Sequence, residues 1–246
     1  MSRETPIDEA LARGDRSGAP DPAARALRDA RKVDAPVDHN PGTITGETPA
    51  AHAARNAMSE LWTVWQSIQT AAADSAVGLP DLARLGQRAL ERGLAACDRA
   101  TDTITRQCEA MEREITEAVQ PPVEPALASD IRRYWRDRLG GKADRLGELH
   151  TAVKADTRTS SAVLGAPAYL SGLGEEQAGV VHISAVQAHA PGTAADLEEA
   201  RRALERVQSA STRATDILAP KIRLWANPEP TSLGKLRVLA DGRAET

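Results

Sequence analysis

The pattern of apolar positions predicts one long helix over residues 80–119. From Leu90 onward, apolar or small residues recur in alternating steps of four and three, the 3.5-residue period of a coiled-coil seam. At 1.5 Å of rise per residue, such a helix is roughly 60 Å long and needs partner helices of similar length. The seam positions are Leu90, Leu94, Cys97, Thr101, Ile104, Cys108, Met111, Ile115 and Ala118.

A proline-rich break after residue 119 predicts that the chain turns back. Pro121 and Pro122 cannot donate backbone hydrogen bonds, whereas Pro125 suits the first turn of a new helix. We therefore expect a coiled-coil-like hairpin over residues 79–164, with a bend at Gly140-Gly141 in its second arm. The apolar positions of that arm are Ala128, Ile131, Trp135, Leu139, Leu146, Leu149 and Val153.

Two further long helices flank the predicted hairpin. Thr48-Pro49 has the pattern of an N-cap followed by a first-turn proline, and the helix it opens is expected to end at Val77, before Gly78. The other is expected to follow a capping box at 193–196 and to be kinked or ended by Pro220. Their seams are Ala54, Met58, Leu61, Trp65, Ile68 and Ala72, and Leu197, Ala200, Leu204, Val207, Ser211, Ala214 and Leu218.

The segment between these helices is less regular. Residues 168–174 are expected to form a turn or short helix after the break at Gly165-Ala166-Pro167. Glu175 to His189 is expected to be a helix, although Val180 to Val186 also fits a strand. We favour the helix because no partner strand is evident. The fold class predicted from the whole pattern is therefore all-α, an elongated antiparallel helical bundle over residues 49–226.

Both ends of the chain differ from this helical part. Residues 1–48 mix prolines, glycines and interspersed charges without periodicity, which predicts a flexible or extended N-terminal arm. Such an arm is either a simple tail or a segment that orders by lying across a neighbouring subunit. Residues 227–246 are expected to form a C-terminal tail, in which Leu233 to Leu239 fits a short strand.

Composition narrows the class of protein. The chain has 246 residues, no phenylalanine and a net charge of −4, so bulk charge does not favour binding to a polyanion. Neither a signal-peptide pattern nor an apolar run of about 20 residues occurs, so we expect synthesis in the cytosol and no membrane insertion. Two cysteines at helical spacing do not suggest a disulfide framework.

No motif for catalysis, metal binding or cofactor binding is recognisable. Cys97 and Cys108 are eleven residues apart on one seam, far wider than zinc-ligand spacing, and are expected to be core thiols. His150, His182 and His189 lack further converging ligands. The glycines around Gly172 do not follow a strand, as a dinucleotide-binding loop requires. We therefore expect a protein that is not an enzyme and that has no metal or cofactor.

One basic cluster contains aromatic residues. It comprises Arg132, Arg133, Arg136 and Arg138 around Tyr134 and Trp135. Stacking on the aromatic rings and contacts from arginine to phosphate would suit nucleic acid. Trp135, however, lies on the apolar seam, and two aspartates dilute the charge. A core tryptophan beside a solvated arginine face explains the same residues.

The segment from Ala168 to Gln177, with the sequence AYLSGLGEEQ, is followed by a helix and then by an Ala-, Glu- and Arg-rich helix. In this last third, the chain resembles uncharacterised helical proteins of tailed-phage structural operons. The resemblance implies a virion or assembly component and carries over no functional residue. We therefore expect a structural protein that forms a homo-oligomer or larger assembly through its helices and arms. The alternative is a nucleic-acid-associated protein that uses the Arg132–Arg138 face.

Overall fold

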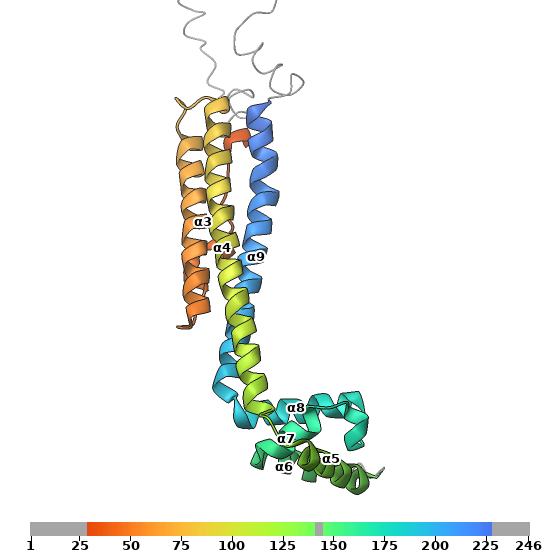
Figure 1. Ribbon diagram of the computed structural model, residues 1–246. Coiled ribbons are helices and arrows are strands. Elements are labelled where there is room, and N and C mark those ends of the chain that lie inside the picture. Colours follow the sequence, from red (N-terminus) through yellow and green to blue (C-terminus); the bar gives the residue numbers. More distant parts are fainter. Residues whose placement is uncertain (1–28, 141–144, 228–246) are drawn as a thin grey trace, which may run out of the picture. The chain divides into compact units, whose positions relative to one another are not determined.

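The computed structural model describes residues 29–140 and 145–227, and the protein is all-α (Figure 1). No strand occurs in these ranges. The described residues fall into two compact units. Unit 1 contains residues 29–35, 63–91 and 214–227, and unit 2 contains residues 36–62 and 92–213. The helices α3 (Pro49–Ala73), α4 (Leu79–Val119) and α9 (Pro191–Ala226) each contribute segments to both units.

The long helix is confirmed, and five of its nine predicted seam positions are buried, while Leu94, Thr101, Met111 and Ala118 are half-buried. Helix α4 is continuous from Leu79 to Val119. Cys97, Ile104 and Ile115 on the predicted seam are buried, while the charged positions between them are exposed. Most seam positions of α3 and α9 are buried, with Leu61 and Trp65 fully enclosed on α3 and Ala200 and Leu218 on α9. Ala72, Leu204 and Ser211 are half-buried. The 3.5-residue period thus identified the buried face of each long helix.

Helix α3 begins where predicted but ends earlier. The hydroxyl of Thr48 accepts a hydrogen bond from the backbone N–H of Ala51 at 3.2 Å, as an N-cap does. The helix ends at Ala73 rather than Val77. There the carboxylate of Asp74 accepts a hydrogen bond from Ala76 N at 2.9 Å, and this local turn replaces the last helical turn that we predicted.

The second arm of the predicted hairpin is interrupted at Gly140, where we predicted a bend, and again at Asp156, where we did not. The described residues between 125 and 164 form three α-helices, α5 (Pro125–Leu139), α6 (Leu146–Ala155) and α7 (Thr157–Leu164). Gly140 ends α5 with φ of +26°, and its N–H bonds the Arg136 carbonyl. Asp156 then ends α6 and caps α7 through the N–H groups of Arg158 and Thr159. Because the chain changes direction at these caps, α5 and α6 both pack against α7.

The 3₁₀ turn η4 (Ala168–Ser171) and helix α8 (Glu175–His189) follow. The turn contacts α5, and α8 contacts α6 and α7, so these elements form a small helical cluster in unit 2. The helix predicted at 175–189 is confirmed, and the strand alternative at Val180–Val186 is wrong. No strand is present nearby in the described part of the chain to pair with it.

Helix α9 differs from the prediction at its start. It begins at Pro191, so Thr193 lies inside its first turn, and the predicted capping box is wrong. The Thr193 hydroxyl instead donates to the Glu114 carboxylate at 3.0 Å. Pro220 does not end the helix, which continues through it to Ala226. The predicted strand at 233–239 and most of the C-terminal tail lie outside the described residues.

The described part of the predicted N-terminal arm packs on the helices. In unit 1, the carbonyl of Ala30 accepts from Trp225 Nε1, and that of Val33 accepts from Gln69 Nε2, each at 3.0 Å. In unit 2, residues 36–48, which we call the strap, form the 3₁₀ turns η1 (Val37–His39) and η2 (Pro41–Thr43). Val33, His39 and Ile44 are buried. Residues 1–28 of the arm lie outside the described residues.

Candidate interaction surfaces

The arginine cluster of α5 is largely engaged within the protein. Arg132 donates to the Ala162 carbonyl at 3.2 Å, and Arg138 binds the Glu148 carboxylate at 2.6 Å. Arg133 and Arg136 lie 3.8 and 3.6 Å from the carboxylates of Asp130 and Asp137. These contacts offset much of the positive charge that would attract phosphate.

The aromatic pair in this cluster is divided between core and surface. Trp135 is buried, as its seam position predicts, whereas the Tyr134 side chain is 54% exposed. The two rings meet edge to face, with centroids 5.2 Å apart. The Arg138 guanidinium lies 5.9 Å from the Tyr134 ring centroid. Tyr134 is thus an exposed aromatic side chain held in place by its neighbours.

Neither the cysteines nor the histidines form a metal site among the described residues. Cys97 and Cys108 are buried free thiols. Burial, aided by Asp98, raises the pKa of Cys97 to about 11, and burial also raises that of Cys108. Thiols in this state are poor nucleophiles and poor metal ligands.

The histidines of the helical cluster are dispersed. His150 Nδ1 lies 2.8 Å from Ser184 Oγ, and His189 Nε2 lies 2.7 Å from the Val153 carbonyl. His182 is exposed on α8. The first two histidines connect α6 to α8, which gives them a role in packing.

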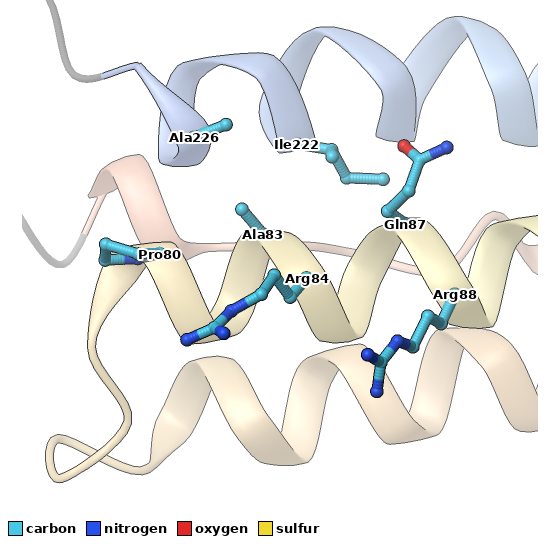
Figure 2. Close-up of a pocket in the computed structure, with 7 residues that line it drawn as sticks. All are labelled: Pro80, Ala83, Arg84, Gln87, Arg88, Ile222 and Ala226. Carbon is cyan, nitrogen blue, oxygen red and sulfur yellow. The ribbon is translucent and has the colours of Figure 1, made fainter.

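A shallow groove in unit 1 lies between the start of α4 and the end of α9 (Figure 2). It has a volume of about 440 Å³, and Ala83, Ile222 and Ala226 form its apolar floor. Arg84 and Arg88 project from α4 at one side, and Arg84 pairs with Asp81. The groove offers apolar contact beside a positive charge but no catalytic group.

The close approach of α4 and α9 beneath this groove depends on a glycine. A Cβ atom at Gly86 would lie 3.0 Å from Ile222 Cγ1 and 3.4 Å from Trp225 Cζ3. A side chain at position 86 would therefore require the Ile222 side chain to shift. Gly86 is an interior helix glycine with a clear packing role.

The strap is held on α9 by three polar contacts in unit 2. Arg213 binds the Asp38 carboxylate at 2.6 Å, and Arg206 donates to the carbonyl of Thr43. The Glu199 carboxylate accepts from the Thr48 hydroxyl at 2.6 Å. Open grooves run along this contact, lined by residues such as Arg202 and Glu205. Most of these interactions join opposite charges or a charge to the backbone.

Exposed large apolar side chains concentrate in the small helical cluster of unit 2. Of the eight exposed ones among the described residues, five lie between positions 127 and 183. Their exposed fractions range from 40% at Leu127 to 70% at Tyr169. Helix α8 contributes two of them, on a different side from its buried residues Val181 and Ala185. The five are Leu127, Tyr134, Tyr169, Val180 and Ile183.

Sequence reasoning identified the aromatic residues of α5 but not the strap or the outer side of α8. His39 and Ile44 lie in a stretch without periodicity, so no pattern predicted their burial. On α8, Val180 and Val181 are adjacent apolar residues, which necessarily point in different directions on a helix. That adjacency was the available signal that α8 has apolar residues on two sides.

Comparison with protein-family models, with curated proteins and with solved structures found no match to this chain. Over residues 29–140 and 145–227, no helix has the length and apolar character needed to cross a bilayer.

Proposed function

We propose that the protein is a non-enzymatic structural or assembly protein that contacts neighbouring subunits through its helices and terminal arms. The observation that carries this proposal is the concentration of exposed apolar side chains in the helical cluster of unit 2. Exposed apolar side chains that adjoin one another mark protein interfaces, and Val180 and Ile183 lie within one turn of α8. The resemblance of the last third of the chain to phage structural-operon proteins makes a virion the assembly to examine first.

The contacts of the long helices agree with a scaffold role. Charged side chains join them on the outside, as in the Arg92–Glu60 pair at 2.9 Å and the Arg201–Glu112 pair at 2.7 Å. Exposed pairs of this kind contribute little stability each, whereas the buried seams provide most of it. The described grooves contain no arrangement of nucleophile, base and oxyanion donors on which a catalytic proposal could rest.

The test is the size of the full-length protein in solution, measured by sedimentation velocity over a range of concentrations. We expect association that strengthens with concentration, or incorporation of the chain into particles isolated from its source. A protein that stays monomeric and is missing from such particles would overturn the proposal. Binding of duplex DNA that weakens steeply with added salt would instead support the nucleic-acid alternative at Arg132–Arg138.

A further inference from the structure

The outer side of α8 carries a short seam that no described residue covers. Glu176, Val180, Ile183 and Gln187 follow one another in steps of four, three and four, so they lie along one side of the helix. All four are exposed, with Val180 at 47% and Ile183 at 57%. The same helix already packs on α6 and α7 through its other side. Its outer seam has the spacing that a second helix would need.

A second observation on the outer side of α8 is the glycine at position 179. It is the fifth of fifteen residues in α8, where glycine is the least favourable residue apart from proline. A Cβ atom there would meet nothing within 4 Å, in contrast to Gly86, where a neighbouring helix explains the glycine. Gly147 and Gly192 also face open space, but both occupy the first turn of their helices, where glycine costs less. No contact among the described residues therefore accounts for Gly179.

The position of Gly179 matches the geometry of helix pairing. Glu176, Gly179, Val180 and Ile183 occupy positions i, i+3, i+4 and i+7, which form the four corners of a hole for an incoming side chain. The missing side chain at Gly179 deepens that hole. A branched apolar side chain such as that of Ile183 would fit it.

The outer seam is complementary to the same seam of a second copy only when the two helices run antiparallel. When a second α8 runs antiparallel, Val180 lies opposite Ile183 of the other copy, and Glu176 lies opposite Gln187. The Gln187 amide then donates to the Glu176 carboxylate. Parallel pairing would place two Glu176 carboxylates against each other, which is unfavourable. Residues 176 and 187 have the same midpoint along the helix as residues 180 and 183. A single two-fold axis through that midpoint therefore relates both pairs.

We propose that the outer side of α8 is a self-association surface that packs antiparallel against α8 of a second copy of this chain. This inference rests on the proposed assembly function and names its contact surface. Two apolar side chains per copy cover less area than a stable dimer interface, so the contact is weak in isolation. In a larger assembly, other contacts between the same subunits would add to it by raising the effective concentration.

The first test compares dimerisation of three full-length proteins by sedimentation velocity. Ile183→Glu places a charge in the proposed hole and should raise the dimer dissociation constant at least about tenfold. His182→Glu is a matched control, since it introduces the same charge at an exposed position off the seam, and should change that constant less than about twofold. Equal effects of the two substitutions would overturn the inference while leaving the assembly function intact.

Gly179→Ala separates the interface from helix stability. Alanine favours the helix, so the variant should melt at a higher temperature than wild type in dilute solution. It also fills the proposed hole, so its dimer should be weaker. A rise in melting temperature without weaker association would contradict the role given to Gly179.

Cross-linking tests the antiparallel register directly. In that register, position 176 of one copy lies beside position 187 of the other, while two positions 176 are about 16 Å apart along the helices. A disulfide requires Cα atoms within about 7 Å. A mixture of Glu176→Cys and Gln187→Cys chains should therefore cross-link faster than either chain alone. Faster cross-linking of the separate chains, or none in any sample, would overturn the arrangement.

Discussion

At the scale of single residues, alanine determines how the core is built. The chain has no phenylalanine, and alanines such as Ala54, Ala200 and Ala214 are fully buried. Small side chains let helix backbones approach closely, and dense interiors tolerate little added volume. The few large buried side chains, including Trp65 and Met58, fill the space that alanine leaves.

His39 makes the strap sensitive to acid. Its side chain is fully buried, and burial together with the nearby Arg213 lowers its pKa below 6.5, although Asp38 opposes the shift. A neutral imidazole is therefore favoured in the folded protein. The stabilisation is complete above the unfolded-state pKa of about 6.5 and is lost as the pH falls toward the lower folded-state pKa.

The predicted outcome is a difference in pH dependence between two proteins. Between about pH 7 and pH 5, wild type should lose more melting temperature than His39→Gln, which cannot take up this proton. Carboxylate titration is common to both proteins and cancels in the comparison. Parallel melting curves across this range would show that His39 does not control the acid response.

At the scale of elements, α9 contains a proline, which is unfavourable inside a helix. Pro220 lies inside the helix and is exposed. It donates no hydrogen bond to the preceding turn, and its ring crowds the carbonyl there. Pro220→Ala should therefore raise the free energy of unfolding by up to about 3 kcal/mol, measured by urea denaturation.

A matched control for this substitution is Gln208→Ala, also exposed on α9, which should change stability by only a few tenths of a kcal/mol. If Pro220→Ala lowered stability instead, the proline ring would have to make contacts that outweigh the missing hydrogen bond.

Element boundaries show what the sequence could and could not predict. The seams of α3, α4 and α9 were predictable because each repeats over many turns, so single exceptions do not hide the period. Within residues 125–164, the break at Gly140 falls where the sequence predicted a bend. The second break was not predictable, since Leu149 and Val153 fit the same seam as Trp135. The decisive feature there was Asp156, whose extended backbone ends α6 and whose side chain caps α7.

The candidate surfaces were harder to predict than the helices. A strap depends on contacts between residues far apart in sequence, such as Asp38 with Arg213, and no local pattern encodes such a pair. The exposure of Val180 and Ile183 depends on which side of α8 meets α6 and α7. Periodicity in a helix with apolar residues on two sides does not decide that choice.

At the scale of the whole molecule, residues 29–48 decide how far the N-terminal arm can be removed without loss of stability. Val33 in unit 1 and His39 and Ile44 in unit 2 are buried on folding. Burial of an apolar side chain such as Val33 or Ile44 is worth about 1.5–3 kcal/mol before the cost of ordering the chain. Removal of residues 1–47 should therefore lower the melting temperature measured by circular dichroism.

A shorter deletion provides the control. Removal of residues 1–28 retains every contact described for Val33, His39 and Ile44, so it should leave the melting temperature close to that of wild type. If the longer deletion were equally harmless, residues 29–48 would contribute nothing net to folding, and their role would be confined to contacts with other subunits.

The positions of the tryptophans give each unit its own optical signal. Trp65 and Trp225 are fully enclosed in unit 1, where Trp225 also donates to Ala30, while Trp62 and Trp135 belong to unit 2. Indole emission shifts when its surroundings become aqueous, so chains that retain a single tryptophan would report on one unit at a time. Coincident fluorescence transitions would mean that the two units unfold cooperatively, and separate transitions would give each its own midpoint.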